Sequence, residues 1–257
     1  MSPVCSSNQM RSSGSVTDAE LARMLAEGAG KILVDIRYQH LLSGYLLGDV
    51  GDAMAQAWIG AVLAQHRPTD AVLSEEATDN GRRLTSDRVW IIDPLDGTRE
   101  FAAGRNDWAV HIALTIGGRP ADCAVSLPAI GEIYTTDTVP AVGGELTGRM
   151  VASRGWASYE SGHVSQRLGL DMVPIGSAGA KAMAVVRGDA DAYVHAGGQY
   201  EWDNCAPVGV AQAAGLHCSR IDGSDLEYNR RSPFMPDFVI CRSELRDPIL
   251  SALAEIA

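Results

Sequence analysis

The sequence predicts an α+β protein built from two tightly joined halves. Three observations predict this class: two helical patterns come first, short apolar strands with tight turns follow, and beyond Gly148 strands and helices alternate. A chain of 257 residues, 46% of them hydrophobic, is long enough to bury a substantial core. We therefore expect an N-terminal half over residues 16–148 and a C-terminal half over residues 149–257, preceded by a disordered polar tail at residues 1–15.

The N-terminal half is expected to begin with two helices. Thr17-Asp18-Ala19-Glu20 has the pattern of a capping box, and apolar residues at helical spacing follow it, which predicts a helix over residues 17–36. The helical spacing returns at Asp52 and stops before Arg67-Pro68, because proline cannot continue a helix. The glycine-containing segment 44–51 is expected to be a loop.

Five short strands complete the N-terminal half. Apolar runs indicate buried strands, and Gly117-Gly118 and Pro128–Gly131 are typical of hairpin turns, so the sheet should be mostly antiparallel. The expected strands cover residues 71–73, 89–92, 108–116, 120–127 and 131–136.

In the C-terminal half, strands alternate with helices. The expected strands cover residues 150–153, 172–175, 191–195, 216–219 and 238–241. Helices are expected over residues 159–168, 178–186 and 243–254. A further helix is expected to start at Asp203, whose carboxylate would cap it.

Charge and composition limit the function classes. Lys plus Arg number 21 and Asp plus Glu number 32, a formal net charge of -11, which excludes a nucleic-acid polymer held by a basic face and disfavours an anionic membrane surface. No apolar stretch reaches the roughly 18 residues of a membrane span, and the first residues lack an apolar signal core. The five cysteines are scattered and form no C-x-x-C pair. These features predict a cytoplasmic protein.

The segment Asp93-Pro94-Leu95-Asp96-Gly97-Thr98 is the most informative for function. A hydrophobic strand delivers Asp93, Pro94 ends the strand ladder, and the turn brings Asp96 back toward Asp93. Two carboxylates held close need a cation between them, and oxygen ligands select a hard ion such as Mg²⁺. The backbone N–H groups of Gly97 and Thr98 are suited to phosphate oxygens. On this segment alone, a surface turn is an equally good interpretation.

Two further acidic positions favour the site over the surface turn. Glu75 follows the preceding strand and would lie beside Asp93 if the two strands are neighbours, although a solvated loop is the alternative. Asp203 precedes an apolar helix, where the roles of helix cap and metal ligand are compatible.

Three segments of the chain together resemble the signatures of the inositol monophosphatase superfamily of Mg²⁺-dependent, lithium-sensitive phosphatases. They are Ser74–Glu76, Trp90–Thr98, and Trp202-Asp203 followed by Ala213–Gly215. The resemblance implies the layered αβαβα sandwich of the sugar-phosphatase, or inositol monophosphatase, fold. It also implies two bound Mg²⁺ ions, with a third, weaker one near Glu75 and Asp52. The implied metal ligands are Glu75, Asp93, the Leu95 carbonyl, Asp96 and Asp203.

The same resemblance implies in-line hydrolysis of a phosphomonoester without a phosphoenzyme. The implied catalytic residues are Asp52, Thr98 and Glu75. One Mg²⁺ would acidify the attacking water while Thr98, oriented by Asp52, helps to take its proton, and a second would stabilise the leaving alkoxide. The amides of Gly97 and Thr98 would receive the phosphate.

Four local features resemble the CysQ, or 3'(2'),5'-bisphosphate nucleotidase, branch of this superfamily and its actinobacterial members. They are Arg99-Glu100-Phe101, Gly176–Lys181, Trp202–Pro207 and Ala152-Ser153-Arg154. This branch hydrolyses 3'-phosphoadenosine 5'-phosphate to AMP. Its substrate carries a second phosphate that the metals do not reach, so the pocket needs cationic or amide groups of its own.

Four residues are the substrate-binding candidates beyond Gly97 and Thr98. Lys181 and Arg154 are candidates for the second phosphate, assisted by Ser177 at a strand-to-helix turn. His195 is a candidate for the ribose or the base. The alternatives are solvated surface positions for the two basic residues and a histidine bonded to a backbone carbonyl.

Two other functions stay open. One is a broader phosphatase for inositol 1-phosphate or fructose 1,6-bisphosphate, because the metals and the Gly97-Thr98 turn handle any phosphomonoester. The other is a non-catalytic nucleotide or Mg²⁺ sensor, which would not need the full ligand set. Residues 44–48 lack the lysine and aspartate that inositol phosphatases carry there, a departure that bears mainly on the third metal. Superfamily members are often dimers, so a homodimer is expected by analogy.

Overall fold

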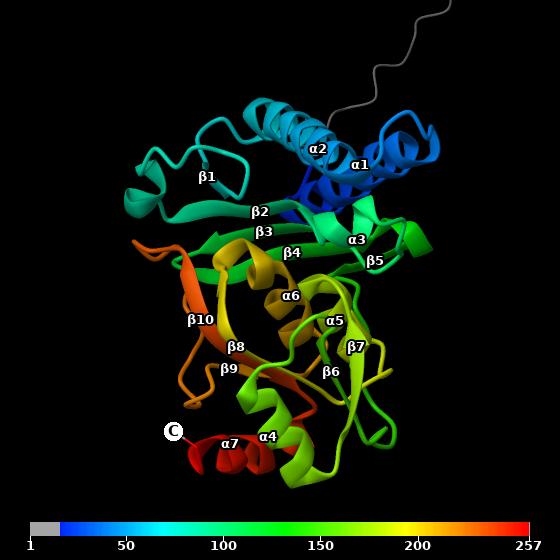
Figure 1. The fold of residues 1–257 in the computed structure, drawn as a ribbon. Helices are drawn as coiled ribbons and strands as arrows, with labels where there is room; N and C mark the ends of the chain where they lie inside the picture. Colours follow the sequence, from blue (N-terminus) through cyan, green and yellow to red (C-terminus); the bar gives the residue numbers. More distant parts are fainter. Residues whose placement is uncertain (1–15, 257) are drawn as a thin grey trace, which may run out of the picture.

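Five layers of helix and sheet make up the protein, whose computed structural model describes residues 16–256. Figure 1 shows α1 and α2 above a first sheet, α5 and α6 between the two sheets, and α4 and α7 below the second sheet. This is the αβαβα sandwich that the sequence predicts. The tail expected at residues 1–15 lies outside the described residues.

The bounds of the helices agree with expectation over most of the chain. The helices are α1 Asp18–Tyr38, α2 Gly44–His66, α3 Thr98–Ala102, α4 Tyr159–Leu168, α5 Ala178–Val186, α6 Glu201–Ala213 and α7 Arg246–Ala254, with 3-10 turns η1 Arg82–Thr85, η2 Pro128–Ile130 and η3 Ser243–Leu245. The strands are β1 Ala71–Ser74, β2 Arg88–Asp96, β3 Ala109–Ile116, β4 Arg119–Leu127, β5 Glu132–Thr135, β6 Arg149–Ser153, β7 Asp171–Ile175, β8 Ala192–Tyr200, β9 His217–Ser219 and β10 Phe234–Cys241.

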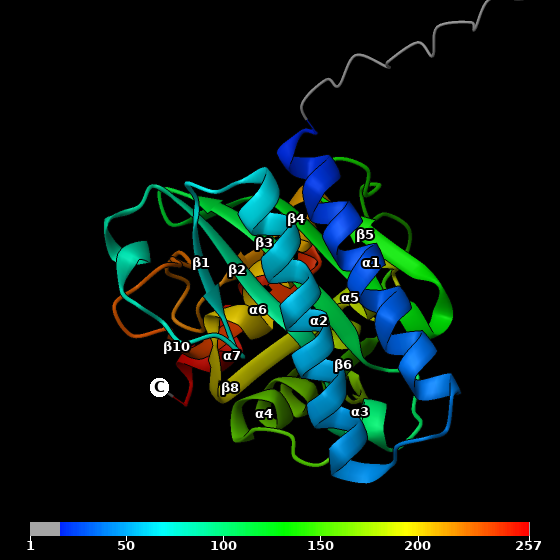
Figure 2. The ribbon, with the colours of Figure 1, turned by 90° about the horizontal axis from the view of Figure 1, so that it is seen from above.

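The first sheet has the order β1-β2-β3-β4-β5, with β1 parallel to β2 and the other pairs antiparallel. Side chains alternate across β2: Trp90 and Ile92 face α1 and α2, whereas Val89 and Ile91 join the central core. Figure 2 shows α1 and α2 side by side across the outer face of this sheet. The mostly antiparallel sheet is confirmed.

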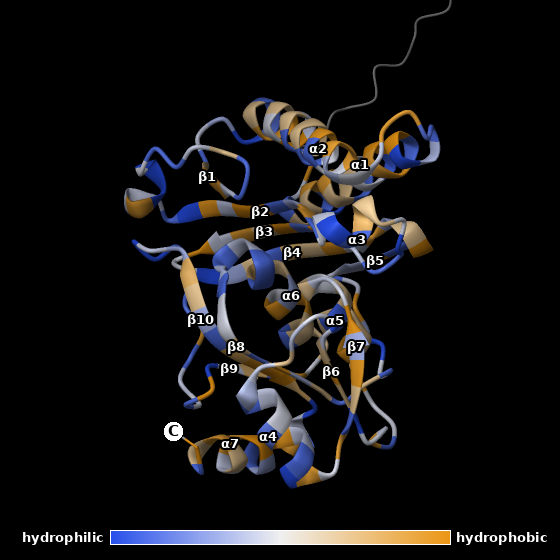
Figure 3. Ribbon diagram, in the orientation of Figure 1, coloured by the Kyte–Doolittle hydropathy of each residue, from blue (hydrophilic) through white to orange (hydrophobic). Residues whose placement is uncertain are grey.

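The second sheet has the order β7-β6-β8-β10-β9. Strands β7, β6 and β8 are parallel, as expected where helices alternate with strands, and β10 pairs antiparallel with β8 and β9. Its outer face packs on α4 and α7 through Met150, Val164 and Ile249. Its inner face meets α5 and α6 in a core that also contains residues of the first sheet, so the two halves share one central layer, where much of the ribbon is apolar (Figure 3).

The loop expected at residues 44–51 is wrong, because these residues form the first turns of α2. Two glycines that indicated a loop are instead places of close packing. A Cβ on Gly48 would lie 2.6 Å from the Thr98 methyl carbon, and one on Gly51 would lie 3.1 Å from side-chain carbons of Leu33 and Phe101. The helix therefore approaches α3 closely, and Asp52 projects from the interior of a helix.

Over residues 16–256, none of the helices combines the length and the apolar character that crossing a bilayer requires. The cytoplasmic location and the homodimer stay predictions.

Candidate active site

A bulge in β2 brings two carboxylates to the same side of the first sheet. Asp93 lies opposite His111 on β3, and Asp96 lies opposite Ala109, so three steps along β2 match two along β3. In a regular strand, residues three apart face opposite sides, and one extra residue restores the same side. The expectation that Pro94 ends the ladder is wrong. Proline sits within the bulge, where the missing N–H breaks no ladder hydrogen bond, and β2 continues to Asp96.

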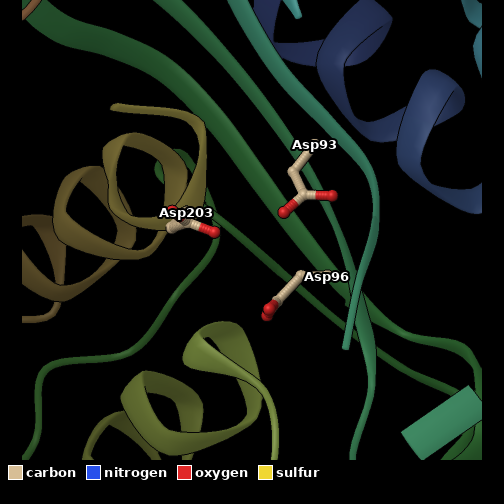
Figure 4. Close-up of side chains that lie close together, drawn as sticks. All are labelled: Asp93, Asp96 and Asp203. Carbon is tan, nitrogen blue, oxygen red and sulfur yellow. The ribbon is translucent and has the colours of Figure 1, made fainter. Parts of the chain in front are cut away.

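Asp203 completes a cluster of three carboxylates. One oxygen from each of Asp93, Asp96 and Asp203 lies within 4.8 Å of the others, and Figure 4 shows the three side chains converging from β2 and α6. Helix α6 begins at Glu201 rather than Asp203, with Tyr200 at the cap position. Asp203 caps it from the first turn instead, because its carboxylate accepts a 2.6 Å hydrogen bond from the Tyr200 N–H.

Glu75 lies beside this cluster. Strands β1 and β2 are neighbours, Ser74 is paired with Ile92, and the Glu75 N–H donates to the Ile92 carbonyl at 3.3 Å. The position beside Asp93 is thus confirmed. The carboxylates of Asp203 and Asp96 are close enough to act electrostatically on Glu75.

The contact implied between Asp52 and Thr98 is also present. The Thr98 hydroxyl lies 3.2 Å from Asp52 Oδ2 and 3.1 Å from the Leu95 carbonyl, within donating distance of either. The buried Asp52 Oδ1 has no hydrogen-bond partner among the described residues. The Leu95 N–H donates to Asp93 Oδ1 at 3.0 Å, which fixes the bulge and aims that carboxylate.

Burial and mutual repulsion control the ionisation of the acids. Burial, followed by the charges of neighbouring carboxylates, raises the pKa of Asp52 to about 8 and that of Glu75 to about 7. The same causes raise the pKa of Asp93 well above its usual range, and burial raises that of Asp203 to about 6. A cation bound at this position would offset both the cost of burying these negative charges and their mutual repulsion.

The donor set fits a hard divalent cation. The five groups are carboxylate or carbonyl oxygens, four of them carboxylates packed closely enough to repel one another. The buried Asp52 Oδ1, which has no hydrogen-bond partner among the described residues, adds one more oxygen acceptor. Oxygen ligands of this kind suit Mg²⁺.

His111 is a residue of the site that sequence reasoning missed. It is fully buried, its Nε2 lies 3.2 Å from Asp96 Oδ2 in a poorly aligned ion-pair contact, and its Nδ1 lies 3.1 Å from the Trp202 carbonyl. Burial lowers the pKa of His111, but Asp96, the Trp202 carbonyl and Asp203 together outweigh burial and raise it. Only the pairing of β3 with Asp93 would have pointed to it.

Asp96 is held by the start of α5 as well as by His111. Its two oxygens accept hydrogen bonds from the N–H groups of Ala178 and Gly179, at 3.1 and 2.6 Å. Burial would raise its pKa, yet His111 and the Gly179 N–H lower it, so Asp96 is the acid of the cluster most readily ionised. A Cβ on Gly179 would lie 2.2 Å from His111 Nε2, so glycine is required for this approach.

The expected phosphate turn and the start of α5 lie against each other. Gly97 has a left-handed φ of 85°, and a Cβ there would be 2.8 Å from that of Ser177. Ser177 is the N-cap of α5 and accepts from the Ala180 N–H at 3.0 Å. Lys181 is buried, its ammonium donates to the carbonyls of Gly176 and Ser177 at 2.6 and 2.9 Å, and burial lowers its pKa to about 8.

Arg154 and His195 lie in different surroundings. The Arg154 side chain is 33% exposed and pairs with Asp107 at 2.6 Å, and Asp107 also accepts from the Gly176 N–H. His195 makes the carbonyl contact that was the alternative for it, with Nε2 3.2 Å from the Gly198 oxygen, and its ring stacks on Phe238.

Hollows in the surface do not all coincide with the acids. One of about 330 Å³ borders Thr98 and is lined by Tyr45, Asp49 and Arg99. A larger one of about 590 Å³ lies between α1 and β5, and none of Asp93, Asp96 and Asp203 lines it. The cluster of carboxylates, rather than the size of a hollow, therefore marks the candidate site.

The sequence profile of the inositol monophosphatase family matches residues 48–140 and 151–256. The chain belongs to this family. As a family member it is similar to the 3'-phosphoadenosine 5'-phosphate phosphatase of Mycobacterium leprae, with 50% identity over 94% of this chain and 95% of the relative. It is 52% identical to the Mycobacterium tuberculosis protein of that name, over 88% of this chain and 90% of the relative.

The fold of the family is matched by solved structures as well. The CysQ structure from Bacteroides thetaiotaomicron superposes with a TM-score of 0.76 at 24% identity, covering 88% of this chain and 97% of that one. The inositol monophosphatase fold implied by the sequence motifs is thus confirmed.

Proposed function

We propose that this protein is a Mg²⁺-dependent phosphatase that hydrolyses 3'-phosphoadenosine 5'-phosphate to AMP and phosphate. The observation that carries the proposal is the 50% identity, over nearly the whole chain, to a curated phosphatase for this nucleotide. The carboxylate cluster beside the Asp52–Thr98 contact supplies the chemistry that such a reaction needs.

The cluster would hold two Mg²⁺ ions. We assign one to Glu75, Asp93 and the Leu95 carbonyl and the other to Asp93, Asp96 and Asp203, with Asp52 and Glu75 as the place for a weaker third. When bound, Mg²⁺ supplies positive charge that offsets the phosphate charge and acidifies a water molecule.

The chain's own residues handle the proton and the phosphate. The Thr98 hydroxyl lies between Asp52 and the Leu95 carbonyl. It can accept a proton from water only if it gives up its own proton at the same time, and the Asp52 carboxylate is the adjacent group that can accept that proton. Without a bound cation, burial and the charges of Glu76 and Glu75 raise the pKa of Asp52 to about 8, so this carboxylate readily takes up a proton. The Gly97 and Thr98 N–H groups would hold the phosphate oxygens.

The residues proposed to bind the second phosphate and the nucleoside differ in how exposed their side chains are. Arg154 has exposed surface and would read the second phosphate, while Asp107 orients it. Lys181 and Ser177 would shape the 176–181 turn, because their polar atoms bond to that turn's own backbone. His195 is proposed to border the nucleoside.

Phosphate release from 3'-phosphoadenosine 5'-phosphate, inositol 1-phosphate and fructose 1,6-bisphosphate tests the proposal. We expect kcat/KM to be at least ~10-fold higher for the nucleotide, a difference of about 1.4 kcal/mol. Asp93→Asn should abolish release from all three, since it removes the carboxylate assigned to both metals, whereas Asp225→Asn, at an exposed pair with Arg119, should not. A preference for either sugar phosphate would refute the nucleotide assignment.

A further inference from the structure

The loop at residues 228–231, which leads into β10, is held from two sides by buried charged residues that the catalytic chemistry does not use. Arg83 of η1, in the connection that begins at Glu75, lies on one side. Glu201, at the first position of α6, lies on the other. Each is only 1% exposed, and they do not pair with each other. The loop therefore links the β1–β2 connection, which begins at Glu75, to α6, the helix that carries Asp203.

Arg83 binds the carbonyl side of the loop. Its Nη1 donates to the Arg230 carbonyl at 2.8 Å and to Asn229 Oδ1 at 3.1 Å, and its Nη2 reaches the Arg231 carbonyl at 3.4 Å. Asn229 Nδ2 donates back to the Arg83 carbonyl at 2.8 Å. A planar guanidinium can serve several carbonyls at once, which a lysine ammonium cannot do in the same geometry.

Glu201 binds the N–H side of the same loop. Its two carboxylate oxygens accept from the N–H groups of Asn229 and Arg230, at 2.7 and 2.8 Å. Asn229 has a left-handed φ of 57°, which turns its N–H toward Glu201 while its side chain faces Arg83. Opposite charges thus hold opposite faces of one short stretch of backbone.

Further contacts tie the loop to the elements of the metal site. The Tyr228 hydroxyl donates to Asn204 Oδ1 at 3.0 Å, next to Asp203 on α6. Its N–H donates to the Gly118 carbonyl in the β3–β4 turn at 2.9 Å. The loop consequently contacts three parts of the structure: the connection after Glu75, the β3–β4 turn, and the first turn of α6.

We propose that Arg83 is a positioning residue, which acts through the 228–231 loop to hold Asp203 at ligand distance from Asp93 and Asp96. The proposal rests on the metal site of the proposed function. The ligands come from both halves of the chain, so their spacing depends on a connection between the halves. His111 makes such a connection through the Trp202 carbonyl, and Arg83 makes a second one through the 228–231 loop.

The test measures the midpoint of Mg²⁺-dependent thermal stabilisation, which needs no substrate and no turnover. Arg83→Lys keeps the positive charge but removes the planar guanidinium group that donates to several acceptors of the loop at once. Asn229→Gly keeps the left-handed backbone and removes the side chain that bridges to Arg83. Arg220→Lys is the matched control, because Arg220 pairs with Asp237 at 2.7 Å beside the same loop but within the C-terminal half.

We expect both loop variants to shift the Mg²⁺ midpoint at least ~10-fold upward, the size seen when residues that support metal ligands are lost. Their kcat at saturating Mg²⁺ should fall by less than about threefold. The control should lower Tm and leave the midpoint within about twofold. Unchanged midpoints in both variants, with a responsive wild type, would refute the positioning role alone. A wild type without any Mg²⁺ response would refute the metal site and the positioning role together.

Discussion

At the scale of single residues, His111 determines how Asp96 is presented. His111→Asn removes the imidazole that lowers the pKa of Asp96 and loosens the Trp202 carbonyl, so the pKa of Asp96 should rise and α6 should lose one anchor. We expect a ~10- to 100-fold loss of Mg²⁺ affinity, measured as the Mg²⁺ dependence of phosphate release.

Thr115→Val is the control for that variant, because Thr115 is a buried polar residue of the same strand whose hydroxyl bonds the Val89 carbonyl far from the acids. It should cost about 1 kcal/mol of stability and leave the Mg²⁺ dependence unchanged. If His111→Asn behaves like Thr115→Val, the histidine merely fills the core.

Residues that belong to a motif were predictable from the sequence as members of the site, whereas His111, which carries no motif, and the direction of the Lys181 side chain were not. Asp93 and Asp96 are three positions apart in one motif, so their convergence needs only a bulge. His111 carries no motif and meets Asp96 only because β3 lies next to β2. The Lys181 ammonium turns back on Gly176 and Ser177, and no spacing in the sequence indicates that direction.

At the scale of elements, α2 shows how glycine can be misinterpreted. Gly48 suggested a loop, but its missing Cβ lets the helix pass within contact of the Thr98 methyl group. Gly48→Ala would place a carbon 2.6 Å from that methyl and force Thr98 away from Asp52. We expect kcat to fall at least ~10-fold, since a small misplacement of a reacting group costs this much or more.

Gly60→Ala in the same helix provides the comparison. A Cβ at this position would meet only Gln56 Nε2 at 4.0 Å, so the substitution should stabilise the protein by about 0.5–1 kcal/mol without changing kcat. Steady-state kinetics and thermal unfolding of the two variants separate helix propensity from crowding at Thr98. Equal kcat values would show that Thr98 tolerates displacement.

The order and type of the other elements followed from periodicity, whereas boundaries at the site did not. Strand β2 passes through Pro94, and α6 starts two residues before Asp203. At both places tertiary contacts outweighed a local signal for an element boundary. At Pro94 the contact is the bulge opposite His111, and at the start of α6 it is the pair of hydrogen bonds from the 228–231 loop to Glu201.

At the scale of the whole molecule, part of the charge of -11 is concentrated in one carboxylate cluster, to which both halves of the chain contribute. The raised pKa values of Asp52 and Glu75, about 8 and about 7, lie above the values near 4 of an unfolded chain. The folded metal-free protein therefore holds more protons than the unfolded chain, and its stability must fall as the pH rises toward 8. The raised pKa of His111 acts in the same direction.

The opposing groups set the best range for the measurement. Because the pKa of His195 is lowered, this group makes stability rise with pH only below about pH 6.5. The pKa of Lys181 is lowered to about 8, so this group makes stability rise with pH only above about pH 8. Between pH 6.5 and 8.0 we expect the Tm of the metal-free protein to fall, and saturating Mg²⁺ to remove most of that fall by binding the ionised acids. Asp52→Asn should flatten the metal-free curve, because it deletes a carboxylate that titrates in this range. A metal-free Tm that rises across this range would mean that these acids are already ionised in the fold, and that the fold needs no cation to hold them together.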